Sequence, residues 1–155
     1  MSVLERITAL LTERGVEFRT MHHEPTPTSE DSARARGEPM EIGGKALVMK
    51  VDDTFRLFVL SGALRVDSRK IRARFGARKA RFATADELRE LTALVPGSVP
   101  PFGEPILPLG LFVDRSVTEN DRVAFNAGSL TDSIIMRTED YLRIAGAEVF
   151  DFAER

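Results

Sequence analysis

Two apolar segments in the first half of the chain limit the possible folds more than any other feature. They are "KALVMKV" (residues 45–51) and "RLFVLS" (residues 56–61), and only "DDT" and Phe55 separate them. Short apolar runs bounded by turn residues are typical of strands buried in a sheet. Asp favours turns because its side chain bonds to the nearby backbone. The pattern therefore predicts two antiparallel neighbouring strands joined by a hairpin turn.

The other patterns predict further helices and strands that do not alternate regularly. Helical spacing of apolar residues, or capping residues, predicts helices over 2–14, 28–37, 67–75, 84–94 and 138–146. Apolar runs predict strands over 16–21, 79–84, 108–114, 122–128, 133–138 and 147–152. Strands in runs with interspersed helices argue against a Rossmann repeat. We therefore expect an α+β fold with a mixed, largely antiparallel sheet and packed helices.

Composition narrows the class of protein. A length of 155 residues fits one domain, predicted to span 1–155. No apolar run is long enough to span a membrane, and charged residues interrupt the N-terminal apolar segment that a secretory signal requires, so we expect a cytoplasmic protein. The chain contains no Cys, which excludes disulfides, thiolate zinc sites and a Cys nucleophile.

Charge is distributed unevenly along the chain. The formal net charge of −2 argues against a protein that coats nucleic acid. Between Arg65 and Arg81, however, Asp67 is the only acid among many basic residues. The predicted helix 67–75 lies in this segment. Its basic surface is either a solvated face or a contact for nucleic-acid phosphates, and both interpretations stay open.

The stretch "GSVPPFG" (residues 97–103) predicts a stiff loop. Pro100 and Pro101 restrict φ and remove two backbone donors, while the flanking glycines permit unusual backbone shapes. This leaves the N–H groups near Ser98 and Val99 available to a ligand. A tight structural connection explains the same composition, so a ligand loop and a plain turn remain alternatives.

Three other segments contain candidate site residues. Lys45 follows Gly43 and Gly44 at the start of a strand, where a solvated flank is the alternative to a phosphate or carbonyl ligand. In "AFNAGSLTDSI" (residues 124–134), small polar residues form either a local turn or the lining of a polar pocket. Asp114 ends a strand, where a cap or turn role competes with a catalytic one.

The pair His22 and His23 invites a metal hypothesis. With Glu24, however, their spacing matches no zinc pattern, and we predict no metal and no cofactor. His23 is kept as a residue that borders a ligand cleft. No Ser-His-Asp order, Walker loop or GxGxxG motif occurs.

Taken together, these motifs resemble the YbaK/ProX family, the free-standing relatives of the editing domain inserted in bacterial prolyl-tRNA synthetases. The resemblance runs from "ITALLTERGVEFRTMHHEPT" through "GGKALVMKV", "GSVPPFG" and "AFNAGSLTDSI" to "DYLRIAGAEVFDF". Within this family, the chain is similar above all to the trans-editing branch directed at Ser- and Thr-charged tRNA (the ProXp-ST type). The resemblance implies the editing-domain fold, a monomer, a mischarged tRNA as substrate and a possible synthetase partner.

The same resemblance implies a hydrolase that cleaves the ester between a wrong amino acid and the terminal adenosine of tRNA. An ordered water and the ribose hydroxyl of the substrate would act without a metal or a covalent intermediate, and Ala or Cys esters are possible further substrates. The alanine-specific branch has a His where this chain has Asn126, which argues against an alanine specialist. Asn can orient a water but cannot act as a proton-transfer base.

These arguments assign three sets of residues. The predicted catalytic residues are Lys45, Gly97, Ser98, Val99 and Asn126. The predicted substrate-binding residues are His23, Thr28, Gly44, Pro101, Phe102, Gly103, Asp114, Gly128 and Ser129, and the predicted tRNA contacts are Arg69, Lys70 and Arg72. Two rival functions remain: a nucleotide- or nucleic-acid-binding module without chemistry, and an esterase or amidase acting on a small amino acid derivative.

Overall fold

The predicted hairpin forms the centre of the larger of two sheets in the computed structural model, which describes residues 1–155. Strands β2 (Gly44–Val51) and β3 (Thr54–Ser61) pair antiparallel along their whole length. The turn between them consists of Asp52 and Asp53, and Asp52 has a φ of 50°. Asp tolerates this left-handed conformation better than most residues. The hairpin prediction is confirmed.

The strands form two sheets, where one was expected. The five-stranded sheet has the order β4-β2-β3-β5-β8, and the three-stranded sheet has the order β1-β7-β6. Pairing is antiparallel except between β3 and β5 and between β5 and β8, so the mixed, largely antiparallel arrangement is confirmed. The remaining strands are β1 (Phe18–His22), β4 (Ala80–Phe82), β5 (Gly110–Asp114), β6 (Arg122–Asn126), β7 (Asp132–Arg137) and β8 (Glu148–Phe150).

All five predicted helices form. Their caps follow from sequence: Thr28, Asp67 and Thr84 each accept a hydrogen bond from an amide in the first turn. Two single-turn elements were not predicted, because they are too short to show a periodic pattern. None of the helices is long and apolar enough to cross a membrane. The helices are α1 (Val3–Glu13), α2 (Ser29–Arg36), the 3₁₀ helix η1 (Met40–Ile42), α3 (Ser68–Phe75), α4 (Ala85–Thr92), α5 (Arg115–Thr118) and α6 (Thr138–Ala145).

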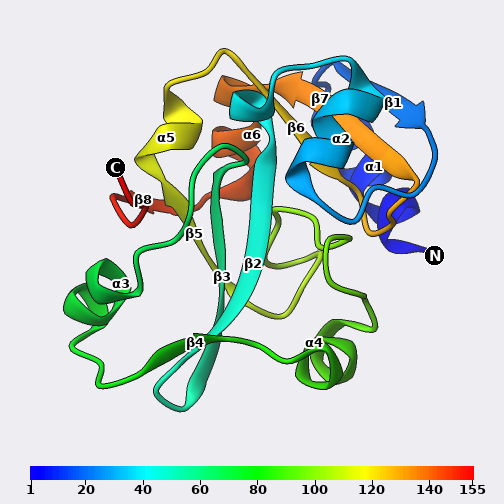
Figure 1. The fold of residues 1–155 in the computed structure, drawn as a ribbon. Coiled ribbons are helices and arrows are strands. Elements are labelled where there is room, and N and C mark those ends of the chain that lie inside the picture. The colour runs from blue at the N-terminus through cyan, green and yellow to red at the C-terminus, as the bar shows by residue number, and fades with distance from the viewer.

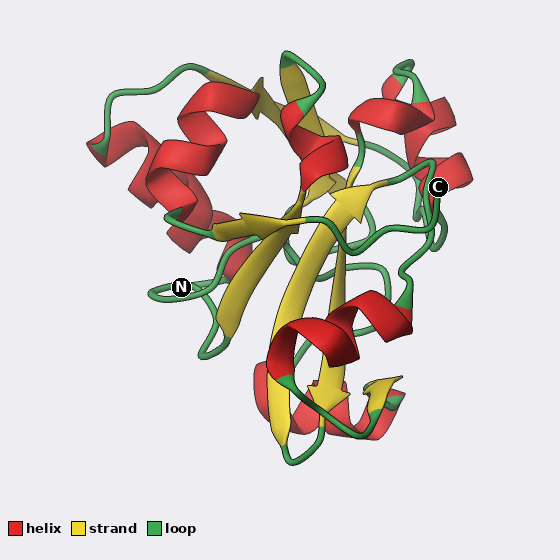
Figure 2. Ribbon diagram, turned by 90° about the vertical axis from the view of Figure 1, so that its left-hand side faces the viewer, coloured by secondary structure: helices red, strands yellow, loops and turns green.

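The five-stranded sheet is buried on both faces. Along β3, Leu57 and Val59 belong to the main core, which includes Ile7 and Leu11 of α1. The alternate residues of the same strand face a second core, rich in Phe, that helix α3 covers. Successive residues of a strand point to opposite faces, so one continuous apolar run supplies both cores. Figure 2 shows helices on both flanks of the central strands.

The two sheets meet where β2 begins. A single parallel bridge joins Gly43 to Ala124 of β6. Figure 1 shows α2 beside this upper end of β2, with α3 and α4 near the opposite end of the strand. The arrangement brings α2, the start of β2 and the end of β6 together at one place.

Candidate active site

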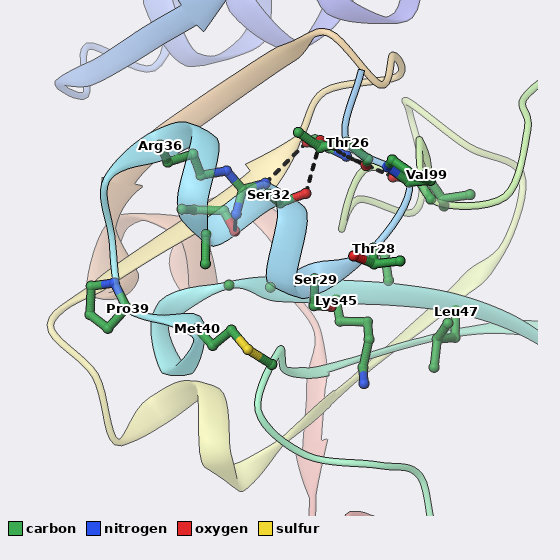
Figure 3. Close-up of a pocket in the computed structure, with 18 residues that line it drawn as sticks. Thr26, Thr28, Ser29, Ser32, Arg36, Pro39, Met40, Lys45, Leu47 and Val99 are labelled. Atoms are coloured by element: carbon green, nitrogen blue, oxygen red, sulfur yellow. Dashed lines mark hydrogen bonds between the residues drawn. The ribbon is translucent and has the colours of Figure 1, made fainter. Parts of the chain in front are cut away.

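A cavity of about 230 Å³ lies between helix α2 and the start of strand β2 (Figure 3). Eighteen residues line it, from the segments 26–36, 39–47, 97–99 and 124–126. None of them is acidic, and Arg36 and Lys45 are the only charged ones. A concave site lined by charge of one sign favours a ligand of the opposite sign. The cavity is therefore suited to an anion, or to a group that develops negative charge.

Arg36, in the last turn of α2, was not predicted as a site residue. Its guanidinium donates to the Ser133 hydroxyl (2.9 Å), to Asn126 Oδ1 (3.1 Å) and, more weakly, to the Ala124 carbonyl (3.5 Å). Burial lowers the pKa of Arg36 to about 10, and the nearby Glu38 carboxylate opposes this shift. All three acceptors are neutral, so hydrogen bonds hold the charge without a carboxylate partner.

Asn126, at the end of β6, is saturated by contacts within the chain. Its Oδ1 accepts from Arg36 (3.1 Å) and from the Ser133 hydroxyl (3.1 Å). Its Nδ2 donates to the Gly97 carbonyl at 2.8 Å and lies 3.5 Å from two oxygens of Thr26. An amide side chain offers two donors and two acceptor positions. Each donor and acceptor position of Asn126 therefore has a partner within the chain, which argues against its predicted role of orienting a water.

The loop at 97–99 is held by hydrogen bonds on both peptides that flank Ser98. The carbonyl of Gly97 accepts from Asn126 Nδ2, and the amide of Ser98 donates to the Val95 carbonyl (3.1 Å). The carbonyl of Ser98 accepts from the Gly128 amide (2.9 Å). The prediction that the Ser98 amide is free for a ligand is therefore wrong, because this amide already donates to the Val95 carbonyl.

The Val99 amide is different. It belongs to the same trans peptide as the Ser98 carbonyl, and the N–H and C=O of a trans peptide point in opposite directions. The bond from Gly128 to that carbonyl therefore directs the Val99 N–H away from Gly128. Val99 lines the cavity, and its amide makes no hydrogen bond to another backbone group. An unpaired backbone N–H at a cavity wall is a candidate donor to an oxyanion.

Lys45 lies at the other side of the cavity. Its side chain leaves β2 on the side away from Arg36 (Figure 3), and the ammonium donates to the Leu64 carbonyl. Burial, and to a lesser extent the charge of Arg65, lower the pKa of Lys45. An ammonium has three donors, so two remain for a ligand.

Two hydroxyls form a directed chain within the cavity lining. Ser32 Oγ donates to Thr26 Oγ1 (2.9 Å), which donates to the Leu130 carbonyl (3.2 Å). Because a carbonyl can only accept, the direction of both hydroxyl groups is set. Ser32 can accept a hydrogen bond from a ligand but has no proton left to donate. The hydroxyl of Ser29, in the same lining, makes no hydrogen bond to the chain.

Several predicted substrate-binding residues lie outside the cavity. Phe102 is 2% exposed and packs edge-on against Phe125 and Tyr141, and the Pro101 carbonyl accepts from the Tyr141 hydroxyl at 2.6 Å. A Cβ on Gly103 would lie 2.5 Å from the Leu109 carbonyl oxygen. These three positions belong to the core, so their assignment to substrate binding is wrong. Close packing in the core explains why Phe and Gly occupy positions 102 and 103.

Asp114 is also structural. It is fully buried, and its carboxylate accepts from the amides of Ser116 (2.9 Å), Phe152 (2.7 Å) and Ala153 (3.1 Å). It caps α5 and fastens the end of the chain. The cap interpretation holds, and the substrate-binding one is wrong.

His23 lies behind the cavity lining. One ring nitrogen contacts the Glu24 carbonyl (2.8 Å) and the other contacts the Ser133 hydroxyl (2.7 Å). It therefore touches the network of Arg36 and lines a neighbouring depression. No cluster of three or more His, Cys, Asp or Glu side chains is arranged to hold a metal ion.

The remaining predicted residues have local roles. Thr28 lines the cavity, but its hydroxyl is occupied by the cap of α2. Gly44 lines the cavity, and a Cβ on it would lie 2.8 Å from Val123, so close packing also requires its small size. Ser129 bonds to Thr131 within a turn (2.8 Å), which matches the turn interpretation.

The basic helix α3 is largely neutralised. Arg69 lies 3.4 Å from Asp67, and Lys70 donates to the Ala153 carbonyl (2.8 Å) and to Asp151 (3.2 Å). Of the three predicted tRNA contacts, only Arg72 has no ion-pair partner. The prediction of tRNA contact stays a prediction.

Comparisons with known proteins place the chain in a family. Residues 23–144 match the model of the aminoacyl-tRNA editing domain. The chain is 37% identical over 154 residues to the multifunctional Ser/Thr-tRNA deacylase ProXp-y of Escherichia coli strain K12, covering 96% of this chain and 91% of that protein. It is 30% identical over 83 residues to the proline–tRNA ligase of Macrococcus caseolyticus, which is 54% of this chain and 14% of the ligase.

The fold agrees with these matches. A solved structure described as a proposed trans-editing enzyme for prolyl tRNA synthetase superposes with a TM-score of 0.83 at 28% identity. The match covers all of this chain and 99% of the other one. The family model spans the cavity, the loop at 97–99 and Asn126. The chain belongs to the aminoacyl-tRNA editing domain family.

Proposed function

We propose that the protein is an aminoacyl-tRNA deacylase that hydrolyses the ester of Ser- and Thr-charged tRNA. The observation that carries the proposal is the Val99 amide, an unpaired donor in a cavity lined by two cations and no acid. Hydrolysis of an ester places negative charge on the carbonyl oxygen. Such a cavity stabilises that charge without reorganisation.

The reaction we propose is direct attack by water. The water oxygen bonds to the ester carbonyl carbon, the bond from that carbon to the ribose oxygen breaks, and the ribose oxygen receives the proton that the water loses. The neighbouring ribose hydroxyl of the substrate passes this proton on. The Val99 N–H holds the oxyanion at the stage of highest charge.

A covalent intermediate on the protein has little support. The Ser98 hydroxyl donates to the Val95 carbonyl (2.7 Å) and accepts from the Val95 amide (3.2 Å), so it is held within the loop. A nucleophilic Ser requires a neighbouring base. The nearest imidazole in the network, His23, does not line the cavity.

Lys45 is the residue we assign to the terminal nucleotide. Its ammonium lies on the side away from Arg36 (Figure 3), and the charge of Arg65 lies close enough to lower its pKa. A phosphate or ribose oxygen placed there leaves the ester near the loop at 97–99. Lys is a suitable phosphate ligand because it acts as a compact point charge.

Preference for Ser and Thr esters follows from Ser32. The Ser32 oxygen accepts from a ligand hydroxyl, and alanine has none to donate. An acceptor with a set direction rejects a ligand that lacks the donor, because the acceptor is then left unpaired. The name of the E. coli relative agrees with this preference.

The wider setting is also a proposal. We infer that the protein acts as a monomer in the cytoplasm on tRNA that a synthetase has mischarged, either free or in association with that synthetase. The partial match to a proline–tRNA ligase supports the relation to that class of synthetase. Size-exclusion chromatography with light scattering tests the monomer.

Deacylation of Ser-, Thr-, Ala- and Pro-charged tRNA by the wild type and by Lys45→Ala tests the proposal. We expect rapid loss of Ser and Thr esters, at least a tenfold slower reaction in the mutant, and spared Pro-tRNA. Lys50→Ala is the matched control, since Lys50 lies on the same strand outside the cavity. If no ester is cleaved faster than in buffer while tRNA still binds, the protein is a binding module.

A further inference from the structure

Arg36 connects three parts of the molecule that meet at the cavity. It comes from helix α2, it donates to Ser133 of β7 and Asn126 of β6, and through Asn126 it reaches the carbonyl of Gly97. The distances along this path are 3.1 Å from Arg36 to Asn126 and 2.8 Å from Asn126 to Gly97. Each contact is within normal hydrogen-bonding range.

The path has a definite direction. A guanidinium only donates and a carbonyl only accepts. The side chain between them must therefore present its oxygen to Arg36 and its nitrogen to Gly97. Asn meets this requirement, whereas Asp would replace the donating nitrogen by a second oxygen and set one acceptor against another at the Gly97 carbonyl. This explains an Asn at position 126 without giving it contact with the substrate.

The carbonyl of Gly97 determines how the loop is held. With Gly97 fixed, the peptide before Ser98 is clamped between Asn126 and the Val95 carbonyl. The next peptide carries the Val99 N–H and is held from behind by Gly128. If the bond from Asn126 to the Gly97 carbonyl is lost, the Gly97–Ser98 peptide is less restrained. This peptide directly precedes the one that carries the Val99 N–H.

We propose that Arg36 is a positioning residue for deacylation, which rests on the function proposed above. Its guanidinium orients Asn126, and Asn126 fixes the loop so that the Val99 amide is aimed at the ester. Arg36 makes no carboxylate contact, because Glu38 is held in a two-point pair with Arg122 (both 3.0 Å).

The test compares Arg36→Met and Arg36→Lys with the same changes at Arg34. Arg34 lies on the same helix, is exposed, and pairs with Glu30 at 3.2 Å. Kinetics are measured on Ser-tRNA, together with the ¹H–¹⁵N shifts of Gly97, Ser98 and Val99. We expect Arg36→Met to lower kcat about 100-fold with little change in KM, which is the size of losing one oxyanion donor.

The loop amides should shift in Arg36→Met and remain unchanged in both Arg34 variants. Arg36→Lys should recover only part of kcat, since an ammonium keeps the charge but cannot bridge Ser133 and Asn126 in a fixed plane. A rise in KM at constant kcat would mean direct substrate binding and overturn the positioning role. So would a loop that does not respond to Arg36→Met.

Three further variants, Asn126→Asp, Asn126→Ala and a double variant, keep the test valid if Arg36→Met misfolds. Asn126→Asp keeps size and should lower kcat as strongly as Arg36→Met. The double variant Arg36→Met with Asn126→Ala should be no slower than Asn126→Ala alone, because both changes break one path. Additive losses would overturn the inference. If the wild type cleaves no ester but the loop amides still respond to Arg36→Met, the proposed function fails and the link from Arg36 to the loop stands.

Discussion

The cavity and helix α3 are both basic, but the cavity leaves both of its cations without a carboxylate partner, whereas α3 leaves only Arg72 unpaired. Arg36 and Lys45 have no carboxylate in the lining around them. On helix α3 and beside it, acids lie next to the cations: Asp67 next to Arg69, Asp151 next to Lys70, and Glu148 next to Arg74. The segment with more basic residues therefore presents less unpaired charge. Where a charge is left unpaired matters more for binding an anion than how many cations a segment contains.

The two regions also differ in what their glycines do. Gly97, in the cavity loop, has a φ of 87°, and a Cβ there would lie 2.9 Å from the Pro27 carbonyl oxygen. Gly76, which ends α3, has a φ of 60° and open space where a Cβ would be. One glycine is required by both conformation and contact, and the other by conformation alone.

The largest effect is expected from Gly97→Ala. The new methyl group collides with the backbone at Pro27, so the loop must move and the Val99 amide loses its aim. We expect kcat for Ser-tRNA to fall about 100-fold or more. Gly76→Ala, the matched control, should cost roughly 1–2 kcal/mol of stability and leave kcat unchanged. Deacylation assays give the kcat of both variants, and thermal unfolding gives their stability. If Gly97→Ala is as active as Gly76→Ala, the loop does not have the role proposed for it.

A smaller and selective effect is expected from Ser32→Ala. It removes the acceptor for a ligand hydroxyl, and a neutral hydrogen bond contributes about 1 kcal/mol. The kcat/KM for Ser- and Thr-tRNA should therefore fall about fivefold to tenfold, while that for Ala-tRNA stays constant. Ser29→Ala is the control, because it removes a hydroxyl from the same cavity lining without removing the Ser32 acceptor. Equal losses on all three esters, or selective loss in Ser29→Ala instead, would show that Ser32 does not read the hydroxyl.

A weak effect is expected from neutralising α3. In Arg69→Gln with Lys70→Gln and Arg72→Gln, only Arg72 has charge to lose, because the other two are already paired. The slope of log affinity for tRNA against log salt should change by about one, which corresponds to one lost phosphate contact. A change near three would mean that the ion pairs open on binding. An unchanged slope would mean that α3 does not contact tRNA.

The smallest effect is expected on the titration of Lys45. Burial and Arg65 both lower its pKa, so Arg65→Gln should raise that pKa toward the usual value of a lysine. Between the folded and unfolded pKa values the unfolded chain binds more protons, so the stability contributed by this group increases with pH in that window. NMR titration of the Lys45 side chain, with Lys50 as reference, measures the shift. A pKa that does not move would show that Arg65 is too far away to matter.

Local sequence was sufficient for the elements that depend on neighbours along the chain. The hairpin at 52–53, the caps at Thr28 and Thr84 and the stops at Gly37 and Gly146 all form as predicted. The "GSVPPFG" motif predicted a loop, and Gly97 and Val99 of this loop line the cavity. It did not indicate which residues face the cavity, and Phe102 and Gly103 pack into the core.

Arg36 shows what a sequence pattern cannot reveal. In "SEDSARARG", Arg34 and Arg36 look alike, but residues two apart point to different sides of a helix. One is solvated, and the other reaches partners 90 and 97 positions away. The only local signal was the place of Arg36 in the last turn of the predicted helix.

By itself, the sequence determined the α+β elements, the order of motifs and the family, because caps, turns and apolar periods act over a few residues. Only the tertiary structure decided which cations stay unpaired, which amide of the loop remains free, and which polar side chains are occupied. These properties depend on acceptors brought in from distant segments. A side chain has the same chemistry everywhere along the chain, and its partners in space determine how much of that chemistry is left for a ligand.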